Sequence, residues 1–549
     1  MIKQLPFKTF LIFSLFWILS LSGQNTVGVL LNEANALNGY TLFTVQKETY
    51  LINNCGEVVN QWSSNFKDGK SVYLLENGNL LRAAQIDNPA SIAIPGVGGR
   101  IELFDWDNNL LWEFDFSDDT RIQHHDIYPM PNGNVLILAA SILTDTEAIQ
   151  LGRDPANLTD AELYNEYLVE LKPVGTNDAD VVWEWHQKDH LIQDFDNTKD
   201  NFGLVGDNPQ LLDINYLGLS NGKKNWMHVN SMQYNEQLDQ IILSTRHLSE
   251  IYIIDHSTTT IEAASSSGGT YQKGGDYLYR WGNPFAYKQG TVTDQKLDGQ
   301  HFPHWIAEGL TDAGKILLFN NGFTKSPGFS EVLILNPPVS APGFYTYTAN
   351  TAYGPNSPDY NYTAPLNTDF FSPILSSAQR LPNGNTLMCE GTSGHFFEID
   401  ADENIVWRYI NPVSITGILS QGDDPESSSV NNNIFRAIKY ASNYAAFDSR
   451  DLSPGLPIEL NPDLTQCAIL AVDDITFNEL SIHPNPVVNI LKIYSDQEIE
   501  KVEIFDVQGR KIKVENSKKN INFTPYSTGI YFLKIYTLKG ITTKKIIKI

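Results

Sequence analysis

The stretch that decides the fold is PNGNVLILAA (131–140), in which a polar turn leads directly into an apolar run. Asn-Gly inside a turn is the strongest short signal for a β-hairpin, because the two central positions adopt positive φ angles that Asn and Gly tolerate best. The same element recurs, strictly or loosely, as ENGNLLRAA (76–84), NEQLDQIILSTR (235–246), TDAGKILLFNNG (311–322) and PNGNTLMCEG (382–391). This repetition indicates one structural unit built several times.

A second repeated element is a short strand that ends on an aromatic residue, usually Trp. Its copies are GEVVNQW (56–62), NNLLWEF (108–114), ADVVWEW (179–185), DYLYRW (276–281) and ENIVWRY (403–409), with FYTYT (344–348) as a degraded sixth. The two elements alternate, so each pair predicts one antiparallel sheet of about four strands, and such sheets packed around an axis make a β-propeller. We therefore predict an all-β chain with a six-bladed β-propeller. Seven blades, or a pair of β-sandwiches, are the alternatives.

Two further segments allow predictions of secondary structure. The strand IFRAIKY (434–440) is predicted to complete one blade together with N-terminal strands, and AELYNEYLVEL (161–171) is predicted to contain a short helix.

Three cysteines are too few for a disulfide scaffold. Cys55 and Cys467 lie near the two ends of the propeller region, so they either form a bridge that joins these ends or remain free. Cys389, inside an apolar strand, is predicted to be a buried thiol.

Composition and charge exclude several functions. Hydrophobic residues make up 42% of the chain and charged residues 19%, as in globular proteins. The formal net charge of -26 argues against DNA or RNA as a partner. A site for a small anion must therefore be built locally from Arg and His side chains. The Gly-rich segments 96–99 and 265–270 do not lie between a strand and a helix, so no nucleotide cofactor is predicted.

The N-terminus has the pattern of a secretory signal. Lys3 and Lys8 precede the apolar run 10–21, which ends among small residues. The run is shorter than the roughly 20 residues that cross a bilayer as a helix. We predict a removable signal peptide at 1–23, the β-propeller at 24–470 and no transmembrane segment after cleavage.

The C-terminal segment, 471–549, is a separate module with short alternating strands, and it is richer in Lys and Arg than the rest of the chain. The pattern predicts a small β-sandwich. It resembles the type A sorting domain of the type IX secretion system of Bacteroidetes, on HPNPV (483–487), FDVQGRKI (505–512), GIYFLKI (529–535) and the basic residues Lys544, Lys545 and Lys548. The resemblance implies handling by the type IX machinery and a secreted or cell-surface location reached through the periplasm.

Histidines stand at the start of three successive units: His124 and His125 in QHHDI, His228 in MHVNS, and His301 and His304 in GQHFPHW. Arg246 follows the strand after His228. In a propeller the innermost strands line the central channel, so these side chains are expected to converge at one mouth. Three histidines would also suit zinc, but Arg246 would repel a cation, and no metal is predicted.

The propeller region resembles the arylsulfate sulfotransferase family, whose members are secreted or periplasmic six-bladed propellers. The matching stretches are QHHDIYPMPNGNVLI (123–137), NWMHVNSMQYNEQLDQIILSTRH (225–247), GQHFPHWIAEGLTDAGKILLFNNG (299–322) and FFSPILSSAQRLPNGN (370–385). The resemblance covers most of residues 27–467. It is most specific where His-x-Asn-Ser is followed by Ser-x-Arg-His, and where Gln-His is followed by Phe-x-Asn-Gly.

The resemblance implies transfer of a sulfuryl group from an aryl sulfate to a phenol through a transiently sulfated histidine, without a nucleotide sulfate donor or cofactor. It assigns as catalytic residues His301, the nucleophile, with His228, Arg246 and His125. It assigns as substrate-binding residues Asn230, His304 and His124. We favour His125 over His124 because His125 stands next to an Asp.

Two positions depart from the family pattern. Phe302 and Pro303 follow His301 where related exported sequences have an acidic residue, so His304 competes for the role of nucleophile. Phe435 replaces a polar residue of the better-known enzymes. The first hypothesis is an exported aryl sulfotransferase, the second a sulfatase-like hydrolase that uses water as acceptor, and the third a non-catalytic propeller that binds anionic glycans or partners.

Overall fold

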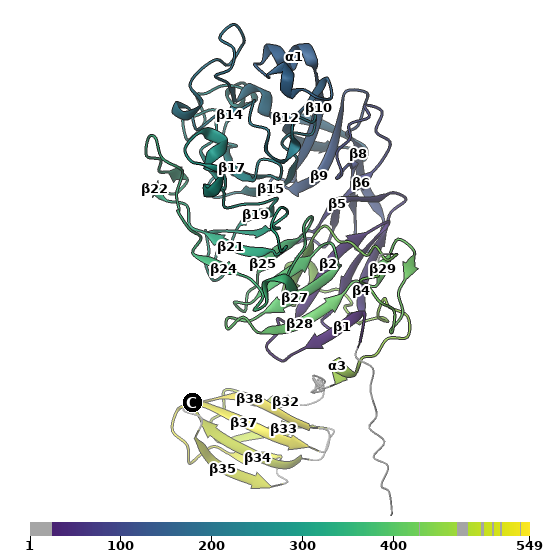
Figure 1. Cartoon of the computed structure of the whole chain (residues 1–549). Coiled ribbons are helices and arrows are strands. Elements are labelled where there is room, and N and C mark those ends of the chain that lie inside the picture. The colour runs from purple at the N-terminus through teal and green to yellow at the C-terminus, as the bar shows by residue number, and fades with distance from the viewer. Residues whose placement is uncertain are drawn as a thin grey trace, which may run out of the picture. The chain divides into compact units, whose positions relative to one another are not determined.

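The computed structural model describes residues 25–427, 429–468, 481–495, 499–507, 510–516, 519–537 and 540–549. The chain forms two compact units that divide between Cys467 and Ala468 (Figure 1). The predicted signal peptide at 1–23, and the predicted boundary between 470 and 471, lie outside the described residues. The prediction of an all-β chain is confirmed.

The first unit contains six antiparallel sheets of four or five strands, each of which we call a blade. Blades 1 to 3, with strands in hydrogen-bonded order, are β31 (Ala437–Ala441), β2 (Gly39–Val45), β3 (Glu48–Ile52), β4 (Val58–Ser63); β5 (Lys67–Leu74), β6 (Leu80–Gln85), β7 (Gly99–Phe104), β8 (Leu110–Asp115); and β9 (Arg121–Pro129), β10 (Val135–Thr144), β11 (Glu162–Val174), β12 (Asp178–His186). Blades 4 to 6 are β15 (Val229–Asn235), β16 (Gln240–Thr245), β17 (Glu250–Asp255), β18 (Tyr279–Trp281); β19 (His301–Trp305), β20 (Ile316–Asn320), β21 (Glu331–Leu335), β24 (Tyr360–Tyr362); and β25 (Ser377–Arg380), β26 (Thr386–Glu390), β27 (His395–Ile399), β28 (Ile405–Ile410), β1 (Gly28–Asn32). Figure 1 shows successive blades following one another around a ring.

The two repeated sequence elements occupy fixed places in the blades. The Asn-Gly turns join the first and second strands, with Gly78, Gly133 and Gly384 at φ angles of +83°, +85° and +89°. The elements that end on an aromatic residue form the fourth strands β4, β8, β12, β18 and β28, of which β28 is covered by β1 and the others lie at the outer edge of their blades. Their tryptophans are buried, so the repeated aromatic positions belong to the hydrophobic core.

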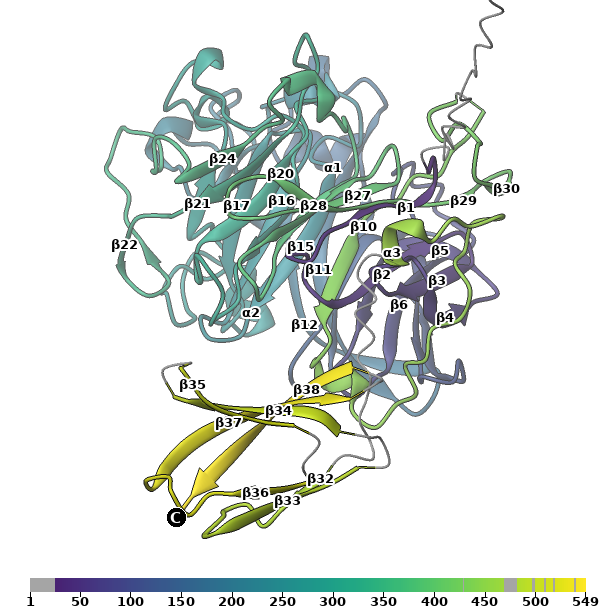
Figure 2. The ribbon, with the colours of Figure 1, turned by 90° about the horizontal axis from the view of Figure 1, so that it is seen from below.

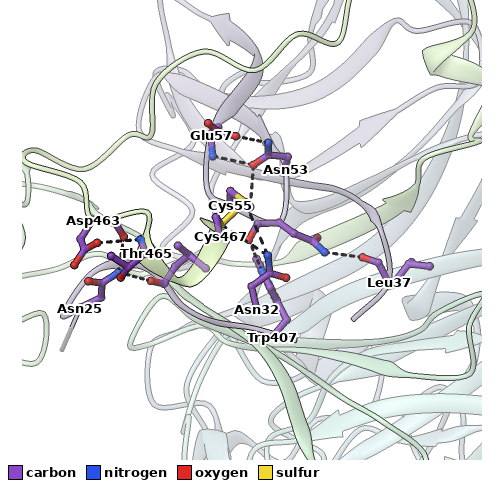
Figure 3. Close-up of a disulfide and its surroundings, with 12 residues drawn as sticks. Asn25, Asn32, Leu37, Asn53, Cys55, Glu57, Trp407, Asp463, Thr465 and Cys467 are labelled. Atoms are coloured by element: carbon purple, nitrogen blue, oxygen red, sulfur yellow. Dashed lines mark hydrogen bonds between the residues drawn. A yellow bond between two sulfur atoms is a disulfide. The ribbon is translucent and has the colours of Figure 1, made fainter. Parts of the chain in front are cut away.

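Segments from the two ends of the propeller hold the ring closed. As predicted, β31 pairs with β2, and the N-terminal strand β1 pairs with β28. Cys55, in the turn before β4, and Cys467, in helix α3 (Thr465–Ala468), form a disulfide, so the bridged alternative is correct (Figure 3). Asn53 fixes the turn, because its Oδ1 accepts from the backbone amides of Cys55 at 2.9 Å and of Glu57 at 3.0 Å. Cys389 is a buried free thiol, also as predicted.

Two expectations about local structure are wrong. Residues 161–171 are not helical: they lie in β11, which pairs with both β10 and β12 and is buried from Leu163 to Leu171. The buried polar residues Asn165, Glu166 and Glu170 interrupt the apolar positions of this strand, so its sequence lacks the period of two that marks a strand with one solvent-exposed face. Phe344 is also not in the outer strand of blade 5, because β23 (Phe344–Tyr345) pairs with β22 (Val339–Ala341) in a separate hairpin and β24 takes the outer place.

The remaining elements of the first unit lie in the connections. Among them are the helices α1 (Asp145–Gln150) and α2 (Thr260–Ala263), several single turns of 3-10 helix, and the short strand pairs β13 (Leu191–Ile192) with β14 (Leu212–Asp213) and β29 (Val413–Ser414) with β30 (Gly417–Ile418). Both helices begin with a capping box, in which Thr144 and Thr259 exchange hydrogen bonds with the Glu three residues later.

The second unit is a small β-sandwich. One layer is β32 (Ser481–His483), β33 (Ile490–Tyr494) and β36 (Asn520–Asn522), and the other is β35 (Lys511–Asn516), β34 (Ile499–Asp506), β37 (Gly529–Thr537) and β38 (Gly540–Lys548). Figure 2 shows the two layers facing each other. Alternate residues of both layers, among them Leu491, Val502 and Leu533, are buried in a shared core.

Candidate active site at the propeller channel

The first strands of neighbouring blades are joined by hydrogen bonds around the channel. The backbone amides of Ile127, Met232 and Phe302 donate to Ser71 Oγ at 3.0 Å, Asp126 Oδ2 at 3.1 Å and Ser231 Oγ at 3.0 Å. In each case a strand of one blade is tied to the next blade along the chain. The starts of these strands are therefore held at fixed places around one mouth of the channel.

Five blades carry a non-glycine residue with positive φ at the start of the first strand: Lys70 (93°), His125 (52°), His228 (52°), Phe302 (52°) and Ser376 (89°). In blades 2 to 5 the pairing with the second strand is irregular at this place. Bulges turn side chains away from the regular alternation, and strained backbone of this kind gathers at functional sites.

A pocket of about 500 Å³ opens at this mouth. Its lining brings together His125, His228, His247 and His301 with the cations Lys70, Lys223 and Arg246. Apolar groups, among them Pro95, Ile374, Leu375 and Phe435, cover the rest of the wall. None of the lining residues is an Asp or a Glu. The volume suits a small molecule, and the charge favours an anion.

His301 has one nitrogen fixed by a neighbouring amide. Its Nδ1 lies 2.7 Å from Asn321 Oδ1. The Asn321 amide nitrogen donates to the carbonyl oxygens of Ser372 at 2.7 Å and Leu375 at 3.0 Å, which fixes the orientation of the amide. Asn321 Oδ1 can only accept, so Nδ1 of His301 carries the hydrogen. The lone pair of the neutral ring is therefore on Nε2.

His228 is held by a different amide. Asn225 Nδ2 lies 3.0 Å from His228 Nδ1. The His125 ring lies 4.9 Å from the His228 ring, centroid to centroid, and the His247 ring lies 4.6 Å from it on the other side. The three rings form a continuous row along the pocket wall.

Burial keeps the histidines of the pocket neutral. It lowers the pKa of His301 to about 3, with Arg246 as the largest electrostatic cause after burial. It also lowers the pKa of His125 and of His228 well below the ordinary value, and that of His247 to about 4. At neutral pH, His301 therefore has an available lone pair, which is the form that acts as a nucleophile.

Arg246 is held beside His301 without a carboxylate on its guanidinium among the described residues. Its guanidinium carbon lies 4.3 Å from the centre of the Phe323 ring. Stacking on an aromatic face leaves the planar N–H donors free to bind an anion. Arg246 thus supplies a positive charge next to a neutral nucleophile.

Three of the predicted substrate-binding residues do not line this pocket. Asn230 is buried, and its amide donates to the Gln300 carbonyl at 2.8 Å. His124 is buried behind His125, with the two Nδ1 atoms 2.9 Å apart. His304 lines a different cavity. These residues lie in the same part of the repeat as the histidines of the pocket, but outside its lining, because neighbours along a bulged strand point in different directions.

The cavity that His304 lines has a different character. It has a volume of about 720 Å³ and lies at the opposite ends of the first strands, with Tyr73, Tyr128 and Tyr440 in its wall. Arg436 and Asp126, whose side chains pair at 2.7 Å, are buried between the two groups of lining residues. Its lining contains glutamates and no Lys or Arg.

Comparison with known proteins agrees with these features. A family model described as arylsulfotransferase (ASST) matches residues 31–416. The chain belongs to the arylsulfotransferase family. The arylsulfate sulfotransferase AssT of Lelliottia amnigena is 26% identical over 184 residues, which cover 32% of this chain and 29% of that protein. The protein of the same name from Escherichia coli O6:H1 is 27% identical over 192 residues, or 33% of this chain and 30% of that protein. The match thus spans under a third of either relative.

Other matches concern the fold and the C-terminal unit. A protein of unknown function from Bacteroides caccae aligns with 73% of this chain and 98% of its own, at a TM-score of 0.37 and 11% identity. A second family model, the secretion system C-terminal sorting domain, matches residues 481–549. It confirms the predicted sorting domain and a secreted or cell-surface location. Within the described residues, no helix has the length and apolar character to cross a membrane.

The structure adds residues that the sequence did not single out. Asn321 sets the tautomer of His301, Asn225 contacts Nδ1 of His228, and Lys70 enters the pocket from blade 2. A signal for Asn321 was present, since it is the Asn of the Phe-x-Asn-Gly strand. Lys70 carried no such signal, because blade 2 has no His in that place.

Proposed function

We propose that this protein transfers a sulfuryl group from an aryl sulfate to a phenol, with His301 as the nucleophile. The observation that carries the proposal is the commitment of His301 Nδ1 to Asn321, which leaves a basic Nε2 on a neutral ring in a pocket with cations and no lining carboxylate. Family membership supports the same chemistry.

In the first half-reaction, Nε2 of His301 attacks the sulfur of the aryl sulfate. The S–N bond forms, the S–O bond to the aryl group breaks, and its electron pair leaves on the aryl oxygen. Arg246 and the imidazole of His228 donate to the sulfuryl oxygens, where charge is spread in the transition state. Phe435 and Leu375 provide apolar surface for the aryl ring.

In the second half-reaction, the oxygen of an acceptor phenol attacks the same sulfur. The S–N bond breaks, and its electron pair returns to Nε2 of His301. The phenol gives up its proton to water before it attacks. Because the enzyme is covalently modified between the two steps, the kinetics are expected to be ping-pong. The sorting domain suggests that the type IX machinery exports the enzyme to the place where it acts.

The experiment is to mix the purified protein with 4-nitrophenyl sulfate and no acceptor, and to measure intact mass and released nitrophenol. One added sulfuryl group per chain with a matching burst of nitrophenol is expected. His301→Ala should abolish both, and His304→Ala should retain both, because His304 lines the other cavity. Continued sulfate release without acceptor would instead indicate a hydrolase. Binding without adduct or burst, over a panel of aryl sulfates, would indicate a non-catalytic propeller.

A further inference from the structure

Lys70 occupies the same place in blade 2 that His125 and His228 occupy in blades 3 and 4. All three have positive φ angles and line the pocket; Lys70 and His125 lie where the first strand is bulged against the second, and His228 directly precedes the bulge of its own strand. A lysine gains nothing from a left-handed backbone in an ordinary strand, where the conformation is unfavourable for a residue with a Cβ atom. At Lys70 the strained backbone is accompanied by a side chain that points into the pocket, and strained residues of this kind gather at functional sites.

Lys70 and Arg246 enter the pocket from different blades. Lys70 comes from blade 2 and His301 from blade 5, three places apart in the ring of six, whereas Arg246 comes from blade 4, next to that of His301. In a displacement at sulfur, as at phosphorus, the entering and leaving atoms lie roughly in line on opposite sides of the transferred group. If His301 is on one side, the aryl oxygen must be on the side away from it, towards blade 2 and Lys70.

We propose that Lys70 is a further catalytic residue, which stabilises the negative charge on the aryl oxygen as the S–O bond breaks. The proposal rests on the proposed function. The Lys70 ammonium donates a hydrogen bond to the departing oxygen and stays protonated throughout. In the second half-reaction the same ammonium favours ionisation of the acceptor phenol, whose proton passes to water before the phenolate attacks sulfur.

The ion pair between Lys70 and Asp68 is weak enough to allow this role. The Lys70 Nζ lies 3.3 Å from Asp68 Oδ2, and both side chains are partly exposed. An ion pair of this kind is weak in water, typically below about 1 kcal/mol. The ammonium can therefore exchange this contact for a fully charged aryl oxygen in the pocket at little cost.

The test compares aryl sulfates whose leaving phenols differ in acidity. Lys70→Met should slow the burst with phenyl sulfate by about 100-fold, as for loss of one donor to a developing anion. The loss with 4-nitrophenyl sulfate should be markedly smaller, because its leaving oxygen carries less charge. Lys70→Arg should restore most of the rate. The control is Lys67→Met, which removes the same charge from an exposed position of the same strand. Equal losses with all donors, or no loss, would overturn the proposal.

A binding measurement separates this proposal from the proposed function. In His301→Ala, which cannot form the adduct, 4-nitrophenol is titrated by absorbance while bound. With Lys70 present the pKa of the bound phenol should fall by about 1 or more, as for an acid beside an opposite charge, and Lys70→Met should remove this effect. If wild type gives no burst with any donor but this effect persists, the function is wrong and the phenolate site stands. If the burst occurs but the phenol ionises equally in both proteins, the Lys70 proposal is wrong.

Discussion

Replacing Asn321 by Leu should slow sulfation of His301 without removing any group that touches the substrate. Two outcomes are open to His301 after the change. Its buried Nδ1–H remains without an acceptor, which costs about 1–3 kcal/mol, or the hydrogen moves to Nε2 and blocks the lone pair. In the first outcome the reaction slows because the Nδ1–H hydrogen bond to Asn321 strengthens as positive charge develops on the ring; a bond that is stronger by about 1–2 kcal/mol in the transition state corresponds to a loss of about 5- to 30-fold.

The matched control is Asn320→Leu. Asn320 precedes Asn321 in the chain and is equally buried, and its side chain also makes three hydrogen bonds: it accepts from the Asp298 amide at 2.7 Å and donates to the Lys296 carbonyl at 3.2 Å and Glu331 Oε2 at 2.9 Å. Both variants should therefore lose stability to a similar extent. In Asn320→Leu, however, the hydrogen bond to His301 remains.

The assay is the burst rate of nitrophenol per folded molecule, with folding checked by circular dichroism. Asn321→Leu should be slow and Asn320→Leu close to wild type. Asn321→Asp should move the acid limb of the pH–rate profile upwards from about pH 3, since a carboxylate beside Nδ1 stabilises the imidazolium. The reasoning is refuted if Asn321→Leu reacts at the rate of Asn320→Leu and its pH profile is unchanged.

Three further predictions concern the site and the fold. Arg246→Gln should reduce the burst rate by about 100- to 1000-fold, measured by stopped-flow absorbance; a loss below tenfold would mean that Arg246 does not bind the sulfuryl group. His124 is fully buried, and burial lowers its pKa to about 3. His124 thus binds a proton more tightly in the unfolded chain than in the folded one. Its contribution to the free energy of unfolding is therefore fully present above about pH 6.5 and is lost as the pH falls towards 3. Between about pH 7.5 and 5, wild type should lose about 2 kcal/mol more stability than His124→Gln in urea titrations, and equal losses would exclude this role for His124. In the double variant Cys55→Ser/Cys467→Ser, the free energy of unfolding under non-reducing conditions should be about 2–5 kcal/mol lower than in wild type, since the disulfide joins residues 412 positions apart in the sequence. A urea midpoint equal to that of wild type would contradict this prediction.

The candidate site was predictable only in part. The repeated position of His125, His228 and His301 before the hairpin turns was visible in the sequence, because every blade starts with the same strand and turn. Asn230 and His304 were predicted with them, but the structure places both outside the pocket. Which residue of a bulged strand faces the channel depends on a local backbone irregularity, for which the alternation of a regular strand is no guide.

The sequence by itself determined the all-β class, the repeated hairpin, the pairing of 434–440 with N-terminal strands and the C-terminal sorting domain. These features follow from local patterns: turn residues that need positive φ, strands with apolar runs, and motifs of contiguous residues. Only the tertiary structure decided that 161–171 is a strand, that Cys55 reaches Cys467, and that Asn321 and Lys70 belong with the histidines. Those outcomes depend on contacts that a local pattern does not specify: the pairing of β11 with β10 and β12, the approach of α3 to the turn before β4, and the meeting of side chains from several blades in one pocket.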